Sequence, residues 1–167
     1  MSLPAALTAK ANEVLEMCLL HGVMLATAES CTGGLVAAAL TAIPGSSRVV
    51  ERGFVTYSNQ AKSTMIGVPP ELIEAHGAVS AEVARAMAEG ALTHSDADVS
   101  LSITGIAGPD GGTAAKPVGT VHIAAASRGA VTLHRPCRFD GDRDAVREQA
   151  AMAALDLVIE RICSFRR

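Results

Sequence analysis

The stretch VMLATAESCTGGLVAAAL, residues 23–40, joins two apolar runs through a polar turn. The first run, residues 23–28, is typical of a short strand, and the Ala-rich run at about residues 32–43 is typical of a buried helix that stops at Pro44-Gly45. The turn between the two runs lies at the carboxyl end of the strand, where open α/β sheets bind their ligands. This order of elements predicts an α/β fold with a site at the turn.

Strands and helices alternate along the rest of the chain. We expect helices at about residues 3–20, 60–66, 80–93 and 143–163, a helical turn after Pro69-Pro70, and strands at about residues 49–57, 99–104, 119–126 and 131–139. Asn59 and Ser80 are the predicted N-caps of their helices. A hairpin-like connection at residues 127–129 joins the last two strands, so we expect a mixed sheet with helices on both faces, in one domain spanning residues 1–167.

The composition argues against several classes of protein. The formal net charge is −3 and Lys and Arg form no run, so nucleic acid is not an expected partner. No stretch approaches the ~20 apolar residues that span a bilayer, and the N-terminus lacks the pattern of a signal peptide. We therefore expect a soluble, cytoplasmic protein that does not bind membranes.

The cysteine and aromatic content describes the core. Four cysteines lie far apart without a C-x-x-C pair, which indicates neither a zinc site nor a disulfide framework. Cys18 and Cys163 are predicted to be small core residues on helices. Aromatic residues make up only 2% of the chain, so aliphatic side chains must fill the core, which favours helices packed closely against a sheet.

The turn after the first strand has the features of a ligand site. Gly33 and Gly34 would let backbone N–H groups approach a ligand, and the start of the next helix favours an anion. Ser30 would lie at the mouth of that site. The alternative is that Ser30 or Thr32 merely caps the helix. The turn is not a G-x-S-x-G elbow, because Ala28 and Thr32 occupy its glycine positions.

Lys62, in TYSNQAK at residues 56–62, is a candidate base. If Asn59 is the N-cap, Lys62 falls in the first helical turn. A cation is disfavoured there, and its pKa is lowered. The alternative is an exposed lysine without a chemical role.

Two further stretches point to a binding pocket. SITGIAGPDGG, residues 102–112, places Thr104 and Gly105 at the end of a strand, in a loop that a plain wide turn does not easily explain. In FDGDRDAVR, residues 139–147, Arg143 and Arg147 lie four apart on one helix face and are able to clamp a phosphate. The aspartates nearby make an ordinary salt-bridged helix start the alternative.

Taken together, these motifs resemble the C-terminal domain of the CinA competence/damage-inducible family, which also occurs as stand-alone nicotinamide-nucleotide amidohydrolases of the PncC type. The resemblance covers nearly the whole chain in order, and the set of motifs is specific although each one alone is weak. The matching stretches are AESCTGG (28–34), PGSS (44–47), GFVTYSNQAK (53–62), GAVS (77–80), SITGIAGPDGG (102–112), KPVGTV (116–121) and GDRDAVR (141–147).

The resemblance implies a three-layer α/β/α sandwich with a mixed, mostly parallel five-stranded sheet, and a homodimer or higher homo-oligomer. It implies hydrolysis of nicotinamide mononucleotide, a small nucleotide substrate, to nicotinic acid mononucleotide and ammonia in pyridine-nucleotide salvage, without a cofactor or metal. The five histidines show no metal-ligand spacing, which agrees with metal-free chemistry.

The resemblance also implies roles for single residues. Ser30 would be the nucleophile. No histidine lies within any of the motifs, so Lys62 would be the base, which requires a neutral amine. Tyr57 would relay the proton or orient Lys62, and Ser46 or Ser47 would support the same network.

The pocket residues follow from the same resemblance. The backbone N–H groups of Cys31, Thr32, Gly33 and Gly34 would bind the oxyanion. Thr104 and Gly105 would line the pocket, and Arg143, helped by Arg147, would hold the 5′-phosphate together with the glycine loop at residues 105–108.

Three questions stay open from the sequence. Cys31 is a rival nucleophile, because a thiolate at a helix N-terminus has a lowered pKa. Glu29 would either orient Lys62 or satisfy the backbone of the turn. Two other functions also fit the sequence: an amidase for another small amide, and a non-catalytic nucleotide-binding or regulatory module.

Overall fold

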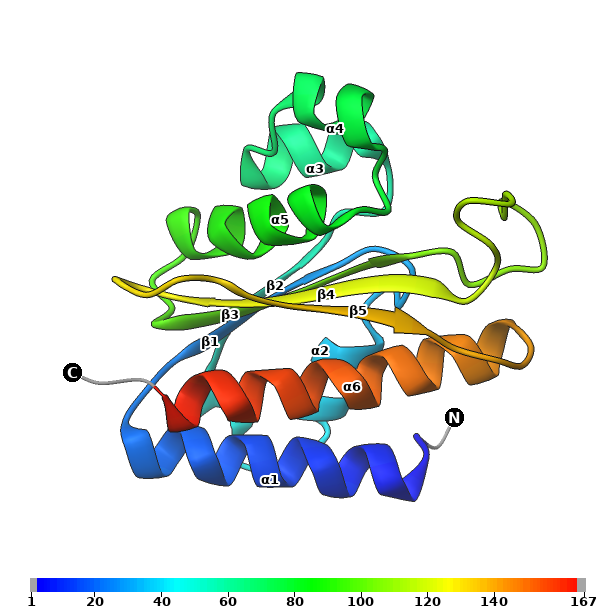
Figure 1. The fold of residues 1–167 in the computed structure, drawn as a ribbon. Coiled ribbons are helices and arrows are strands. Elements are labelled where there is room, and N and C mark those ends of the chain that lie inside the picture. The colour runs from blue at the N-terminus through cyan, green and yellow to red at the C-terminus, as the bar shows by residue number, and fades with distance from the viewer. Residues whose placement is uncertain (1–2, 165–167) are drawn as a thin grey trace.

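A five-stranded sheet lies between two layers of helices (Figure 1). The computed structural model describes residues 3–164. The helices are α1 (Ala5–His21), α2 (Leu35–Thr41), α3 (Asn59–Ile66), α4 (Pro70–His76), α5 (Ala81–Thr93), α6 (Arg143–Cys163) and the short 3₁₀ helix η1 (Ser46–Arg48). The strands are β1 (Leu25–Glu29), β2 (Val50–Val55), β3 (Val99–Gly105), β4 (Thr120–Ser127) and β5 (Leu133–Arg138). The predicted three-layer α/β/α architecture is confirmed.

The strand order β2-β1-β3-β4-β5 determines where a site can form. β1 pairs in parallel with β2 and β3, whereas β4 is antiparallel to both β3 and β5. Only β4 is therefore reversed, which confirms a mixed, mostly parallel sheet. The chain changes direction across the sheet between β1 and β3, and such switch points are where open α/β sheets bind ligands.

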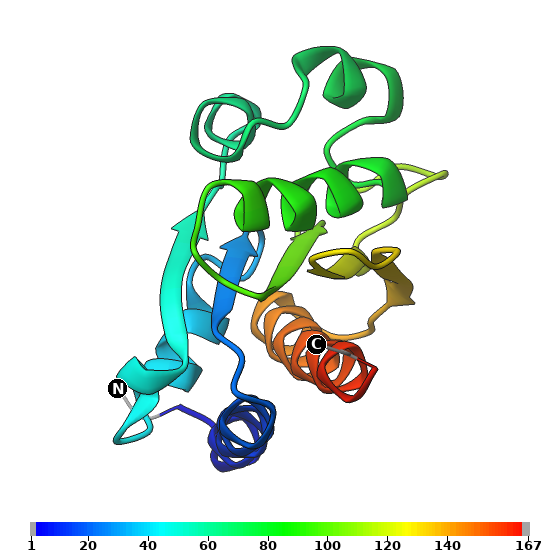
Figure 2. The same cartoon turned by 90° about the vertical axis from the view of Figure 1, so that its left-hand side faces the viewer.

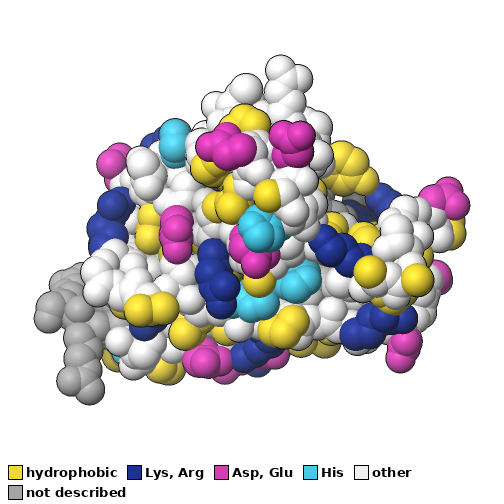
Figure 3. Space-filling model, turned by 45° about the horizontal axis from the view of Figure 1, so that its top comes forward, with side chains coloured by type: hydrophobic (Ala, Val, Ile, Leu, Met, Phe, Trp, Pro, Cys, Tyr) yellow, Lys and Arg dark blue, Asp and Glu magenta, His cyan; other side chains and the backbone are white. Residues whose placement is uncertain are grey.

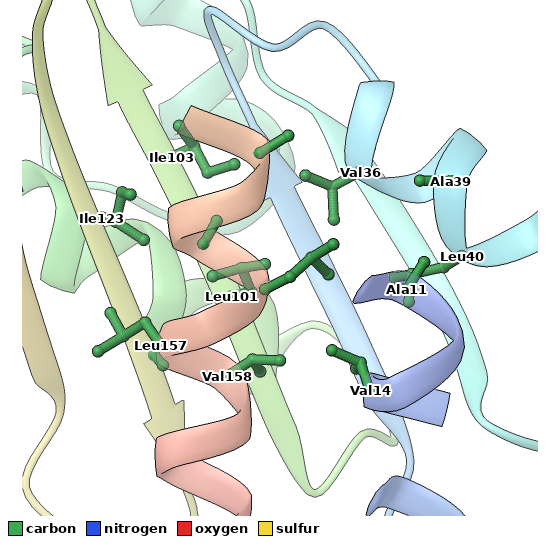
Figure 4. Close-up of a cluster of buried hydrophobic side chains, with 14 of the residues drawn as sticks. Ala11, Val14, Val36, Ala39, Leu40, Leu101, Ile103, Ile123, Leu157 and Val158 are labelled. Carbon is green, nitrogen blue, oxygen red and sulfur yellow. The ribbon is translucent and has the colours of Figure 1, made fainter. Parts of the chain in front are cut away.

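The lower layer holds the larger apolar core. α6 packs on β3 and β4, α2 packs beside it, and α1 covers both from outside (Figures 1 and 2). Aliphatic side chains from these helices and from the strands interlock in the core, as Figure 4 shows for Val36, Leu40, Leu101, Ile123 and Val158. The predicted aliphatic core is thus found between the sheet and this layer.

The upper layer approaches the sheet closely through small residues. α5 packs directly on β3 and β4, and α3 and α4 lie beyond it (Figure 1). Ser100 and Ser102 each donate a hydrogen bond of 2.6 Å to a backbone carbonyl of α5, at Ala88 and Ala84. The alternating polar residues of β3 thus face α5, and their buried hydroxyls are satisfied by the helix.

Some predicted boundaries and caps differ in the structure. α2 begins at Leu35, three residues later than predicted, because Gly33 and Gly34 have φ values of +58° and +99°, which are incompatible with a right-handed helix. Asn59 was the wrong N-cap: the Ser58 hydroxyl accepts the hydrogen bond from the Ala61 N–H, at 3.0 Å. Ser80 is confirmed as the cap of α5.

One of the two cysteine predictions is confirmed and the other is wrong. Cys18 is fully buried in α1, as predicted. The prediction for Cys163 was wrong, because it ends α6 on the exposed side, one residue after the buried Ile162. Across residues 3–164, no helix is long and apolar enough to cross a membrane.

Candidate active site

A cavity of about 290 Å³ opens at the carboxyl ends of β1 and β3. The turn after β1, the loop after β2, the loop after β3 and the start of α6 all contribute to its wall. The predicted site residues that line it are Ser30, Cys31, Tyr57, Lys62, Thr104, Gly105 and Arg143. Four motifs that are far apart in the sequence therefore meet in one cavity.

Ser30 and Lys62 lie side by side at the bottom of the site. Lys62 Nζ is 3.2 Å from Ser30 Oγ. Only 1% of the Lys62 side chain is exposed, and burial lowers its pKa below the ordinary value of 10.5. Within residues 3–164 no carboxylate forms an ion pair with it. Because a buried ammonium without a counter-ion is costly, this environment favours the neutral amine.

The other contacts of Lys62 fit a neutral amine that accepts a proton from Ser30. Nζ lies 2.9 Å from the carbonyl oxygen of Thr56 and 3.4 Å from that of Tyr57. A neutral amine has two N–H groups, which these carbonyls satisfy, and one lone pair, which remains for the Ser30 hydroxyl. The sequence did not single out Thr56, because a backbone carbonyl leaves no residue-type signal.

Cys31 is a poor nucleophile at neutral pH. Its side chain is only 6% exposed, and burial raises the pKa of its thiol to about 11. The thiolate that would attack a carbonyl is therefore scarce. The lowered pKa expected at a helix N-terminus is not found, since α2 begins only at Leu35.

Glu29 satisfies the backbone of the turn rather than orienting Lys62. Its buried carboxylate accepts hydrogen bonds from the N–H groups of Gly34, Val36 and Ala37, at 3.1, 3.1 and 2.9 Å. A carboxylate at this position also opposes the partial positive charge of the α2 N-terminus. The start of α2 is thus already occupied by an anion from the chain itself.

These contacts narrow the predicted oxyanion site. The N–H of Gly34 is bound to Glu29, and the N–H of Gly33 donates to the Ser30 carbonyl at 2.9 Å. Gly33 and Gly34 therefore shape the turn but offer no free donor, contrary to the prediction. In the described part of the chain, the N–H groups of Cys31 and Thr32 have no oxygen acceptor, which leaves them as the two available donors beside Ser30.

Tyr57 and Arg143 close the opposite side of the cavity. The Tyr57 side chain is 60% exposed, and its hydroxyl accepts a hydrogen bond of 3.0 Å from Arg143 Nη2. Arg143 Nη1 donates to the carbonyl of Gly108 at 2.7 Å. Lys62 therefore contacts the backbone carbonyl of Tyr57 and not its side chain. The Tyr57 hydroxyl, which we expected to relay a proton to Lys62 or to orient it, is hydrogen-bonded to Arg143 instead.

The predicted site residues that do not line the cavity are Thr32, Gly33, Gly34, Ser46 and Arg147. The Arg147 guanidinium turns away and binds the carbonyls of Cys31 and Thr32. Ser46 begins η1, ahead of β2, and so lies at the opposite end of the parallel strands from Ser30; the neighbouring Ser47 lies there too. Within one chain, neither serine reaches Lys62.

Most of the chain matches a known domain family. Residues 7–162 match the model of the CinA C-terminal domain. The chain belongs to the CinA C-terminal domain family. Two relatives carry the name CinA-like protein: one from Geobacter sp. (strain M21), 58% identical over 135 residues, and one from Geobacter sulfurreducens, 51% identical over 141 residues. The matches cover 81% and 84% of this chain but only 32% and 34% of those proteins, so this CinA domain spans about a third of their length.

Solved structures of CinA relatives have the same fold. The competence/damage inducible protein CihA from Agrobacterium tumefaciens superposes with a TM-score of 0.92 at 48% identity, covering 96% of this chain and 98% of that one. The competence damage-inducible protein A (ComA) from Klebsiella pneumoniae gives a TM-score of 0.91 at 35% identity, covering 96% and 99%.

Thr104 and Gly105 form the floor of the cavity in this CinA domain. The Thr104 hydroxyl donates to the Ala78 carbonyl at 2.8 Å, so it ties the loop before α5 to β3. A Cβ on Gly105 would lie 2.7 Å from Val121 Cγ2 and 3.1 Å from Cys31 Sγ, so no larger residue fits there. Both residues shape the pocket without a free polar group.

Histidine side chains gather on the face shown in Figure 3, outside the cavity. His122 Nδ1 and His134 Nε2 are 2.9 Å apart, and burial lowers the pKa of both rings. His76 Nδ1 lies 3.6 Å from Glu82 Oε1. Within residues 3–164, no three His, Cys, Asp or Glu side chains are placed to hold a metal ion.

Replacing Glu29 with alanine is expected to destabilise the fold by about 2–4 kcal/mol, because it leaves three N–H groups without their charged acceptor. Glu29→Gln keeps one carbonyl oxygen and should lose about half as much. Urea unfolding measures both values. Glu16→Ala, which removes an exposed carboxylate, is the control and should stay within about 0.5 kcal/mol of the wild type. Equal stability of all these variants would contradict the capping role.

Proposed function

We propose that this CinA domain hydrolyses the carboxamide of nicotinamide mononucleotide to give nicotinic acid mononucleotide and ammonia. The observation that carries the proposal is the contact of 3.2 Å between Ser30 Oγ and a buried Lys62 that has no counter-ion. A serine next to a neutral lysine is a known arrangement for acyl transfer, in which the amine removes the hydroxyl proton during attack.

The first half of the reaction forms an acyl-enzyme. Ser30 Oγ bonds to the carboxamide carbon while its proton moves to Lys62 Nζ, and the carbonyl oxygen becomes an oxyanion. We assign this oxyanion to the N–H groups of Cys31 and Thr32, which have no oxygen acceptor among the described residues. When the C–N bond breaks, the Lys62 ammonium returns its proton to the departing nitrogen, which leaves as ammonia.

The second half releases the acid. A water molecule attacks the ester carbon, Lys62 takes one proton from it, and the Ser30–carbon bond breaks. The proton then returns from Lys62 to Ser30 Oγ, which restores the starting state. Every proton in both halves passes through one nitrogen, so the reaction depends on Lys62 being neutral at its start.

The charges of the cavity suit the two ends of this nucleotide. The pyridinium ring of the substrate is cationic, so its arrival beside Lys62 further disfavours the ammonium form. Arg143 lines the cavity and, among the described residues, forms no ion pair with a carboxylate, so its guanidinium is available to the phosphate. The volume of about 290 Å³ lies at the lower end of the ~300–1,000 Å³ typical of ligand pockets, which favours a mononucleotide over a dinucleotide.

The direct test is an ammonia assay on a panel of amides. We expect release from nicotinamide mononucleotide, with much slower release from nicotinamide itself and from glutamine. Release from another amide but not from the mononucleotide would assign the same site to a different amidase. Calorimetry that shows nucleotide binding without any turnover would instead indicate a binding or regulatory module.

Arg143→Ala is expected to raise KM for the mononucleotide about 10- to 100-fold, with a smaller fall in kcat, because holding the phosphate stabilises substrate and transition state alike. Steady-state kinetics measure the changes in KM and kcat separately. Nicotinamide riboside, which lacks the phosphate, should show little change between wild type and variant. Arg138→Ala, on an exposed arginine of β5, is the matched control. A fall in kcat at constant KM would contradict phosphate binding by Arg143.

A further inference from the structure

Arg147 makes a contact that phosphate binding does not explain. It projects from α6 to the turn after β1, where its Nε lies 3.2 Å from the carbonyl oxygen of Cys31 and its Nη2 lies 3.0 Å from that of Thr32. It is absent from the cavity wall. Within residues 3–164 its ion-pair partner is Asp144, whose carboxylate lies 3.7 Å from Nη1 and is almost fully exposed. The guanidinium is thus committed to two consecutive peptide groups of the turn.

These contacts fix the direction of the neighbouring N–H groups. A trans peptide is planar, and its C=O and N–H point in opposite directions. The Cys31 carbonyl and the Thr32 N–H belong to one peptide group, so binding of that carbonyl by Arg147 turns the Thr32 N–H away from α6. Ser30 in the same turn is held in a similar way, because its carbonyl accepts from the Gly33 N–H at 2.9 Å. That bond turns the Cys31 N–H outward as well.

The Thr32 N–H is a buried donor without an acceptor. Thr32 is 0% exposed, and no hydrogen bond of the described residues uses its N–H. Buried backbone N–H groups are almost always paired, and the exceptions call for a functional explanation. The other N–H groups of the turn, at Gly33 and Gly34, are paired. The donors of the turn that lack an oxygen acceptor are therefore those of Cys31 and Thr32, the two residues that follow Ser30.

We infer that Arg147 is a positioning residue that holds the Cys31–Thr32 peptide with its N–H toward the oxyanion. The inference rests on the proposed hydrolysis of an amide at Ser30. Arginine suits this task because its planar fork presents Nε and Nη2 to two acceptors at once, whereas lysine offers a single ammonium. Glu29 clamps the far end of the same turn through Gly34. The turn is therefore held from both sides before substrate arrives.

The test compares Arg147→Ala and Arg147→Lys with the wild type on nicotinamide mononucleotide and on nicotinamide riboside. We expect Arg147→Ala to lower kcat about 10²–10³-fold, as loss of one oxyanion donor does. KM should stay within about threefold, and the factor on kcat should be the same for the riboside. Arg147→Lys restores one contact and should lose about tenfold; it carries the test if the alanine variant does not fold. A loss confined to KM, a loss that vanishes on the riboside, or an unchanged kcat would overturn the inference.

A second readout separates this inference from the proposed substrate. In labelling by a fluorophosphonate, Ser30 Oγ bonds to phosphorus, its proton moves to Lys62 Nζ, and the P–F bond breaks to release fluoride. The phosphoryl oxygen of the reagent needs the same donors as the oxyanion. We expect Arg147→Ala to slow this labelling about as much as it slows kcat, even if the wild type hydrolyses none of the amides tested. Arg135→Ala is the control. Like Arg147, Arg135 donates to a backbone carbonyl, in its case that of Ala153 in α6, and the two side chains are similarly exposed. Equal labelling of Arg147→Ala and wild type, or equal slowing by Arg135→Ala, would contradict the positioning role.

Discussion

Replacing Ser30 with alanine should lower the rate of ammonia release by about 10⁴–10⁶-fold, the range seen when a nucleophile is removed from a serine hydrolase. The change removes one oxygen atom from a side chain that is 8% exposed, so the cavity keeps its shape. Binding of nicotinamide mononucleotide, measured by calorimetry, should stay nearly constant, because Arg143 and the cavity wall are untouched. The expected result is a protein that binds the nucleotide without hydrolysing it.

No neighbouring group is able to replace Ser30 in this experiment. The Cys31 thiol has its pKa raised to about 11, and the Thr104 hydroxyl is engaged with the Ala78 carbonyl. Ser63→Ala is the matched control, since it changes a serine next to Lys62 that lies outside the cavity. Substantial ammonia release from Ser30→Ala would move the nucleophile elsewhere and remove the basis of the mechanism.

The position of the site could be predicted from the sequence because parallel strands bring their carboxyl ends together. Ser30 follows β1, Lys62 lies in the first turn of the helix after β2, Thr104 is near the end of β3, and Arg143 begins the helix after β5. These four strands run in the same direction. Sequence spacing alone identifies such positions, and the topology places them at one edge. Ser100, Ser102 and Thr104 also alternate along the sequence, and this spacing places them on one face of β3, because the side chains of a strand alternate between its two faces.

The directions of side chains could not be predicted in this way. Arg143 and Arg147 share a helix face, but the first lines the cavity and the second contacts the turn after β1. Ser58 and Asn59 are both good capping residues, and the path of the backbone after β2 determines that Ser58 is the one that caps α3. Glu29 had two possible roles in the sequence, and only the three N–H groups around it distinguish them.

The sequence also could not show which N–H groups of the turn are left without an acceptor. Whether Gly33 or Thr32 offers a free N–H depends on which carbonyl closes the turn, and every residue type except proline has both groups. The oxyanion site was therefore predicted as a range of four residues. Among these four, only the N–H groups of Cys31 and Thr32 lack an oxygen acceptor in the described residues, which is why we propose them as the donors. Arg147, which the spacing had suggested for phosphate binding, instead contacts the carbonyls of Cys31 and Thr32.

Lys62→Met should lower the rate of ammonia release about as strongly as the change at Ser30, by about 10⁴–10⁶-fold, because the two residues act as a unit. Methionine keeps the length and apolar contacts of the lysine stem without a base. In the wild type, kcat/KM should rise with pH as the amine loses its proton, with a midpoint below 10.5, the ordinary value from which burial lowers the Lys62 pKa. A midpoint at or above that value would contradict a buried neutral base.

The same lowered pKa predicts how stability depends on pH. Between the lowered pKa of the folded state and the ordinary value near 10.5, the unfolded chain binds a proton that the folded chain lacks. The free energy of unfolding of the wild type should therefore rise relative to Lys62→Met across this window, by up to about 1.4 kcal/mol per pH unit. Below the window both states are protonated, so the burial cost is constant and at its largest.

The difference between the two proteins isolates Lys62 from every other titrating group. Loss of the hydrogen bonds to Thr56 and Tyr57 shifts the stability of Lys62→Met by an amount that does not depend on pH. Only the proton on Lys62 makes the difference vary, so urea unfolding at several pH values reports its pKa without any substrate. A difference that is flat up to pH 10 would mean that the amine keeps its ordinary affinity for the proton. Lys62 would then be charged beside Ser30 at neutral pH, and unable to start the reaction.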